Sequence, residues 1–232
     1  MSTSSRTKDI LKRSLQVVVF VLILAAILFV PAGSLDWVMA WVFIGTYLGT
    51  TVVGVSVVAK ASPELIEERR QVKEGTKMWD RILTNLFSLV SVPVVLIVAG
   101  LDYRFEWSPR IPLALQIIAL VVEILAYGLV FWAMMPNQFF ATYVRIQKDR
   151  GHSVISDGPY RFVRHPGYVG MITSALAIPL MLGSLWAFIP AGLGACIVIV
   201  RTALEDRTLQ EELDGYRDYV GQVRYRLLPG VW

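Results

Sequence analysis

The residues that could do chemistry are concentrated in two stretches of the second half of the chain. The first, "GPYRFVRHPGYVG" at residues 158–170, places His165 among arginines and tyrosines, between helix-breaking glycine and proline. The second begins with "RTALEDRTL", in which Arg201 and Glu205 are four residues apart and would share one face of a helix. Taken alone, this pair could be an ordinary surface ion pair worth about 0.3–0.5 kcal/mol.

Together these residue types suit a zwitterionic ligand that carries a ring. Arg201 could bind a carboxylate or phosphate through two parallel hydrogen bonds, and Glu205 could hold a cationic group. His165 could donate or accept a hydrogen bond, but with His152 it lacks the third ligand of a zinc site, so no metal is expected. The two stretches contain no nucleophile–base pair, phosphate-cradling glycine loop or carboxylate dyad. Flat faces for stacking a heteroaromatic ring come from Tyr160, Phe162 and Tyr168.

The elements that must position these residues are apolar helices. Of the 232 residues, 55% are hydrophobic and only 17% are charged, a balance that favours a membrane protein over a soluble domain. We predict an all-α polytopic membrane protein of about six transmembrane helices, four of which reach or approach the ~20 residues needed to cross the hydrocarbon core. The predicted spans are residues 15–30, 37–59, 82–101, 111–135, 168–182 and 185–200.

The last two predicted spans are shorter than the others and form a C-terminal helical hairpin. They contain Pro179 and Pro190 and are joined by the tight turn "LGSLW", and their length leaves open whether the hairpin crosses the bilayer fully. Because a hairpin returns its ends to the same side, we expect His165 and Arg201 to be near neighbours. The sequence therefore predicts a polar, aromatic-lined pocket at the membrane surface.

The distribution of positive charge predicts the orientation in the membrane. Of the 22 lysines and arginines, 20 fall on one side of the six predicted spans, and only Arg104 and Arg110 fall on the other. This asymmetry places both termini, the loops at 60–81 and 136–166, and the pocket in the cytoplasm, in the inner membrane if the cell is prokaryotic. The net charge of +4 thus reflects topology, and no nucleic-acid partner is expected. Four arginines next to the spans are predicted to anchor to anionic headgroups: Arg161, Arg164, Arg224 and Arg226.

Two further features are ambiguous from the sequence. The loop at 60–80 contains Ser62 and Pro63, a plausible helix start, and could form a short helix along the membrane interface or a solvated connector. Glu123 lies deep in an apolar span, where a carboxyl group is a functional candidate by default. It could instead be protonated and hydrogen-bonded to Asn85 or to another helix.

The stretches "GHSVISDGPYRFVRHPGYVG" and "RTALEDRTL…GYRDYVGQVRYRLLPG" resemble the isoprenylcysteine carboxyl methyltransferase family, including its bacterial and archaeal members. The resemblance runs from Asn137 to the C-terminus. Its elements occur in order: Gly-x-Tyr, Arg-His-Pro-x-Tyr, an Arg followed four residues later by Glu, and Tyr-x-x-Tyr. One departure is that the family's paired glutamates appear as Glu205 and Asp206, with a segment to Tyr216 that is one residue shorter. Asp206 is therefore a weaker candidate than Glu205.

The resemblance implies an integral membrane enzyme that transfers a methyl group from S-adenosyl-L-methionine to a carboxylate and releases S-adenosyl-L-homocysteine. Residues 1–135 would form a four-helix membrane region, and residues 136–232 would form the catalytic region. Arg201 would bind the substrate carboxylate, and Arg201 and Glu205 would be catalytic. The implied partners are membrane lipids and a lipophilic or lipid-linked methyl acceptor. The implied cofactor-binding residues are Gln147, His152, Ser153, Val154, Ile155, Tyr160, His165, Pro166, Gly167, Tyr168 and Glu205.

Two other functions compete with this one. A related phospholipid methyltransferase would methylate a lipid amine, but an amine gains nothing from the Arg201 side chain. A transporter or channel would place Glu123 in its pathway. The missing inverted repeat and the concentration of polar motifs on one face argue against transport.

Overall fold

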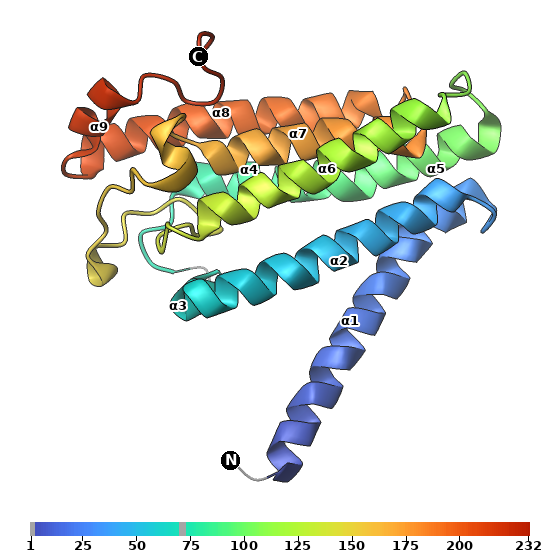
Figure 1. The fold of residues 1–232 in the computed structure, drawn as a ribbon, viewed down its shortest axis with the longest axis horizontal. Coiled ribbons are helices and arrows are strands. Elements are labelled where there is room, and N and C mark those ends of the chain that lie inside the picture. The colour runs from blue at the N-terminus through green and yellow to red at the C-terminus, as the bar shows by residue number, and fades with distance from the viewer. Residues whose placement is uncertain (1–2, 70–72) are drawn as a thin grey trace.

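The computed structural model describes residues 3–69 and 73–232, without the side chains of residues 3–15, 66 and 67. Four of the 20 basic residues counted on one side of the predicted spans have side chains that are not described: Arg6, Lys8, Lys12 and Arg13. The described residues contain no strand, which confirms the all-α fold (Figure 1). The helices are α1 (Thr3–Ala32), α2 (Val38–Ala61), α3 (Pro63–Glu68), α4 (Met78–Leu89), α5 (Val95–Phe105), α6 (Leu113–Met134), α7 (Pro166–Leu182), α8 (Phe188–Glu212) and α9 (Tyr216–Gln222), with short turns η1 (Val90–Val94), η2 (Lys148–Arg150) and η3 (Gly158–Arg161).

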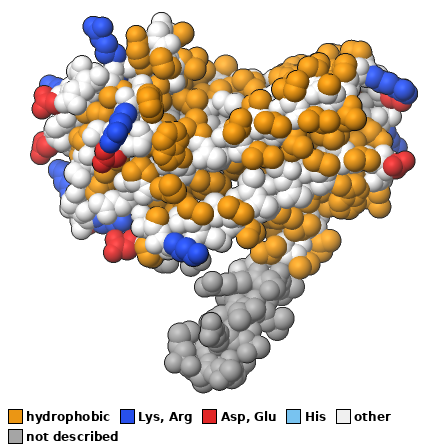
Figure 2. Space-filling view, in the orientation of Figure 1, with side chains coloured by type: hydrophobic (Ala, Val, Ile, Leu, Met, Phe, Trp, Pro, Cys, Tyr) orange, Lys and Arg blue, Asp and Glu red, His pale blue; other side chains and the backbone are white. Residues whose placement is uncertain are grey.

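The long helices have the character of membrane spans. α4, η1 and α5 form one helix of 28 residues, in which a π-helical turn accommodates Pro93, whose nitrogen has no hydrogen to donate. Within the described residues, four helices are long and apolar enough to cross a membrane: α2, the α4–α5 helix, α6 and α8. α7 and the apolar part of α1 are shorter. Hydrophobic side chains cover the middle of the visible face and charged ones gather at its two ends (Figure 2).

The predicted C-terminal hairpin is present, but its second helix is longer than the sequence indicated. α7 and α8 pack side by side (Figure 1). The span expected to end at residue 200 continues to Glu212, giving α8 25 residues. Pro190 does not interrupt α8 because it lies in the first turn, where no intrahelical donor is required. The extension beyond the apolar run carries Arg201 and Glu205.

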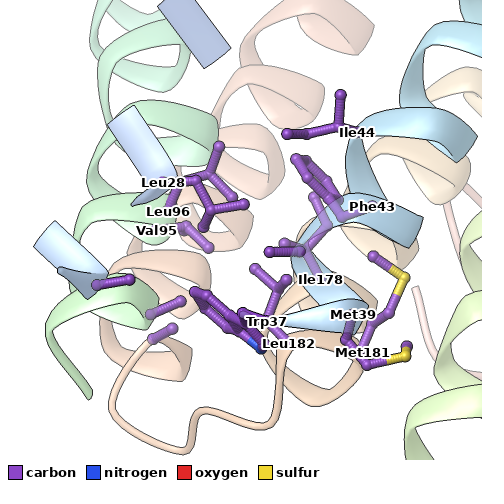
Figure 3. Close-up of a cluster of buried hydrophobic side chains, with 14 of the residues drawn as sticks. Leu28, Trp37, Met39, Phe43, Ile44, Val95, Leu96, Ile178, Met181 and Leu182 are labelled. Carbon is purple, nitrogen blue, oxygen red and sulfur yellow. The ribbon is translucent and has the colours of Figure 1, made fainter. Parts of the chain in front are cut away.

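The core lies where α1, α2, α5 and α7 meet (Figure 3). Leu28, Phe43, Leu96 and Met181 are almost completely buried in this cluster. Outside this cluster, the axes of α6 and α7 approach each other closely at Gly170. A Cβ atom added at Gly170 of α7 would lie 2.7 Å from the carbonyl oxygen of Ala126 and 2.7 Å from a methyl carbon of Val130, both in α6.

The polar segments collect at one end of the bundle (Figure 1). The loop between α6 and α7, the helix α9 and the C-terminal segment lie around the C-terminal end of α8. The predicted helix at Pro63 is present as α3, but its Leu65 is fully buried against Val58 and Met134 rather than turned toward lipid. The apolar side of α3 therefore packs on the protein.

The close approach of α7 to α6 can be tested with Gly170→Ala. Because the new methyl group would press on a backbone carbonyl, we expect a loss of about 1–3 kcal/mol in the free energy of unfolding, despite the better helix propensity of alanine. The matched control is Gly128→Ala in α6, where an added Cβ would meet nothing within 4 Å. Unfolding in detergent measures both variants. Equal stability of the two would contradict the packing described here.

Candidate active site

A cavity of about 260 Å³ lies at the polar end of the bundle. It is lined by the loop between α6 and α7, the first turns of α7, the C-terminal half of α8, and part of α4. Of the twelve residues predicted for the site, ten line this cavity: His152, Ser153, Val154, Ile155, Tyr160, His165, Gly167, Tyr168, Arg201 and Glu205. The expectation that His165 and Arg201 are neighbours is thus confirmed.

The other two of these twelve residues, and Phe162, have other positions. Gln147 is buried outside the cavity lining, where its amide nitrogen donates to the carbonyl oxygen of Phe139 at 2.8 Å and its oxygen accepts from Arg150 at 2.6 Å. Pro166 is the first residue of α7, a position for which its fixed φ is well suited. Phe162, expected to offer a ring face, is 64% exposed and does not line the cavity.

Tyr168 connects the two predicted motifs. Its ring is nearly parallel to that of His165, with centroids 5.7 Å apart, and the guanidinium carbon of Arg201 lies 5.2 Å from the Tyr168 centroid. The Tyr168 hydroxyl donates a hydrogen bond to Oε2 of Glu205. The neighbouring Gly167 allows the ring of Phe140 to approach the start of α7, since a Cβ at Gly167 would lie 2.6 Å from that ring.

Arg201 is oriented by a buried aspartate that the sequence analysis did not identify. Nε and Nη2 of Arg201 donate to the two carboxylate oxygens of Asp80 at 2.6 and 3.3 Å, and Nη2 also donates to the carbonyl oxygen of Thr142 at 2.8 Å. Asp80 additionally accepts from the backbone N–H of Val144 at 2.7 Å. Nη1 of Arg201 forms no hydrogen bond within the described part of the chain, and Arg201 lines the cavity.

A second buried carboxylate, Asp206, holds the cavity wall together. It accepts from Nε and Nη2 of Arg164 at 2.7 and 3.1 Å and from Nε of Arg226 at 2.8 Å. Nε2 of His165 lies 3.3 Å from its Oδ1. The prediction that Arg164 anchors to lipid headgroups is therefore wrong, because its side chain is buried against Asp206, and Arg226 is turned inward as well. Arg161 remains largely exposed.

The far wall consists of aromatic and aliphatic side chains. Tyr160 accepts a hydrogen bond on its hydroxyl from Asn137 at 2.8 Å, and its carbonyl oxygen accepts from the Tyr219 hydroxyl at 2.7 Å. Burial raises the pKa of Tyr160, so its phenol stays neutral. The buried cluster around it contains Val154, Ile155, Leu209, Leu213, Tyr216 and Tyr219. Tyr216 and Tyr219 thus pack the C-terminal segment.

His152 is held as a neutral imidazole. Its ring packs on Phe139 with centroids 4.4 Å apart, and its Nδ1 accepts from the backbone N–H of Gln147 at 3.3 Å. Burial, followed by the nearby charges of Arg145 and Arg150, lowers the pKa of His152 to about 4. The ring therefore carries no charge at neutral pH.

Part of the lining comes from helix α4 and the loop before it, outside the region predicted to be catalytic. Asp80, Thr84, Phe87 and Ser88 recur at spacings of four, seven and eight residues, so they share one face of α4. This spacing could have identified the shared face from the sequence alone. It does not indicate which helix the face contacts. Thr84, Phe87, Ser88 and Arg69 line the cavity. The cavity therefore draws on residues from both sides of position 136.

Of the two kinds of partner expected for Glu123, Asn85 or a group on another helix, the structure has the second. Oε1 of Glu123 accepts from the hydroxyl of Ser174 in α7 at 3.0 Å, whereas Oδ1 of Asn85 lies 3.5 Å from the Tyr143 hydroxyl. The second oxygen of Glu123 is buried and has no hydrogen-bond partner within the described residues. Glu123 does not line the cavity.

Comparison with known proteins agrees with this arrangement. Residues 117–211 match the model of the isoprenylcysteine carboxyl methyltransferase (ICMT) family. A segment of 51 residues is 38% identical to the Protein-S-isoprenylcysteine O-methyltransferase of Schizosaccharomyces pombe (strain 972 / ATCC 24843), and this match spans 22% of the present chain and 22% of that relative. The segment that is similar to this family, residues 117–211, carries the cavity loop, α7 and nearly all of α8.

Proposed function

We propose that the protein is a membrane methyltransferase that uses S-adenosyl-L-methionine to esterify the carboxylate of a lipid-linked or amphipathic acceptor. The observation that carries the proposal is the meeting, in one cavity, of Arg201 held by Asp80 and Glu205 held by Tyr168. These side chains provide an oriented cation for an acceptor and an oriented anion for a cofactor. The S. pombe relative is named for the same class of reaction.

The cavity fits the cofactor in its chemical character. Glu205 has Oε2 bound by Tyr168, and the carboxylate can hold the cationic end of the cofactor. The rings of Tyr160 and Tyr168 provide aromatic surface for the adenine, and the segment from His152 to Ile155 borders the same space. When bound, S-adenosyl-L-methionine supplies a methyl group activated by its sulfonium charge.

The reaction requires no proton transfer. An oxygen of the acceptor carboxylate forms a bond to the methyl carbon while the carbon–sulfur bond breaks and its electron pair remains on sulfur. The products are a methyl ester and S-adenosyl-L-homocysteine, and the negative and positive charges disappear together. The neutral His152 and Tyr160 fit this chemistry, since neither a general base nor a general acid is needed.

Positioning is then the main task of the site. Holding two reactants in line can contribute about 7–11 kcal/mol to lowering the barrier. Arg201 would orient the acceptor carboxylate, and its own orientation is fixed by Asp80 and Thr142. Phe87 and Met171 line the part of the cavity bordered by spanning helices, where the apolar portion of an acceptor would lie. We place this site on the cytoplasmic side, following the distribution of lysine and arginine.

Cofactor binding is the direct test of this function. Calorimetric titration of the detergent-solubilised protein with S-adenosyl-L-homocysteine should show saturable binding. Glu205→Gln should weaken it about tenfold to a hundredfold, because a hydrogen bond to a charged group is lost. The matched control, Glu211→Gln, changes an exposed glutamate on the same helix and should bind as the wild type does. Absence of binding by folded wild-type protein would overturn the proposed function.

The pair of Asp80 and Arg201 gives a second prediction. Asp80→Asn leaves a buried guanidinium without its counter-charge, so we expect a loss of about 3–5 kcal/mol in the free energy of unfolding. In the double variant Asp80→Asn/Arg201→Gln the uncompensated charge is gone, and the loss should be smaller than the sum of the single losses. Additive effects in this double-mutant cycle would show that the two side chains do not depend on each other.

A third prediction concerns pH. Unfolded His152 takes up a proton near pH 6.5, whereas in the folded protein its pKa is about 4. Its contribution to stability is therefore present above pH 6.5 and is lost as the pH falls from about 6.5 to about 4. His152→Gln lacks this contribution, so the difference in unfolding free energy between wild type and variant should shrink over that interval. A difference that stays constant would mean that His152 titrates normally in the folded protein.

A further inference from the structure

A second guanidinium group, that of Arg69, borders the cavity. Arg69 directly follows α3, and its backbone N–H donates to the carbonyl oxygen of Leu65 at 3.1 Å. Its Nη1 donates to the carbonyl oxygen of Phe140 at 3.0 Å, and its Cζ lies 5.5 Å from the centroid of the Phe140 ring. The side chain is therefore held in a defined position at the cavity.

The segment at residues 140–142 positions Arg69 and Arg201 together. The hydroxyl of Thr142 donates to the carbonyl oxygen of Arg69 at 3.1 Å, and the carbonyl oxygen of Thr142 accepts from Nη2 of Arg201 at 2.8 Å. One residue thus contacts both arginines. Burial lowers the pKa of Arg69, and the nearby positive charge of Arg201 lowers it further. Since arginine remains protonated in proteins, the two like charges repel each other unless an anion lies between them.

Two other buried arginines at the cavity have carboxylate partners. Asp80 balances Arg201, and Asp206 pairs with Arg164. On the cofactor side, Glu205 accepts a hydrogen bond from the hydroxyl of Tyr168, and a cationic ligand could bind to this carboxylate. Arg69 brings a further positive charge to the side of the cavity where Arg201 lies, and an acceptor carboxylate there would be attracted by both guanidinium groups.

We propose that Arg69 is a specificity-determining residue that binds the acceptor carboxylate together with Arg201 and selects carboxylates over neutral or cationic acceptors. This inference rests on the proposed function, because it divides the same cavity into a cofactor part and an acceptor part. Glu205 and Tyr168 form the anionic side, and the two arginines form the cationic side. Arg69 lies outside the segment matched by the family model, residues 117–211.

The experiment measures binding of two acids and their amides to protein saturated with S-adenosyl-L-homocysteine. The probes are N-acetyl-S-farnesyl-cysteine and N-dodecanoylglycine, each beside its carboxamide, which removes the charge and leaves the remainder of the molecule unchanged. The variants are Arg69→Gln, which removes the charge, and Arg69→Lys, which keeps the charge without the planar pair of donors. Arg81→Gln is the matched control, because Arg81 is exposed and does not line the cavity.

We expect the wild type and Arg81→Gln to bind at least one acid about tenfold to a hundredfold more tightly than its amide. Arg69→Gln should lose most of this ratio while its affinity for S-adenosyl-L-homocysteine stays unchanged, and Arg69→Lys should lie between. The inference is overturned if Arg69→Gln keeps the ratio, or if the wild type prefers neither acid over its amide. Absence of S-adenosyl-L-homocysteine binding by the wild type would instead sink the proposed function. Unchanged cofactor affinity in the variants also shows that they are folded.

Discussion

The carboxylate of Asp206 is completely buried, and its need for hydrogen-bond donors brings together segments that are far apart in the sequence. A bare carboxylate would be very costly to bury, so the position is tolerable only because several donors converge on it. Arg164 reaches it from the loop before α7, Arg226 from the C-terminal segment, and Tyr216 from α9. Satisfying this one charge folds the loop and the C-terminal segment over the end of α8, and that arrangement forms a wall of the cavity.

The buried carboxylate of Asp80 likewise brings together distant segments at the opposite wall of the cavity. It joins α4 to α8 through Arg201 and to the cavity loop through the backbone of Val144. Consecutive turns of α8 therefore bring Arg201, Glu205 and Asp206 to three different partners: Asp80, Tyr168 and Arg164. Because one rigid helix carries all three side chains, the distance between the proposed acceptor-binding and cofactor-binding parts of the site is fixed by helical geometry.

The sequence predicted the features that depend on local pattern and failed where distant partners decide the outcome. Hydropathy located the apolar helices. The spacing of turn-forming, aromatic and charged residues located the segment at residues 158–170 around His165. Hydropathy detects where an apolar run ends, not where a helix ends, so the extension of α8 to Glu212 was missed. An arginine beside a span looks the same whether its partner is a lipid phosphate or a carboxylate 42 residues away, as for Arg164 and Asp206. Asp80 was missed for the same reason, since 121 positions separate it from Arg201.

Buried ion pairs of this kind are weak evidence for stability, because apolar side chains of similar volume often stabilise a protein equally well. Their value here is geometric. The proposed methyl transfer to a carboxylate would remove two charges and move no proton, so the site would need charges that are already fixed rather than groups that titrate. Asp80 holds Arg201 in one orientation, and Tyr168 holds Glu205 in another. With His152 and Tyr160 kept neutral, the charges of the site are oriented before any ligand binds, and the proposed reaction would need little reorganisation of the protein.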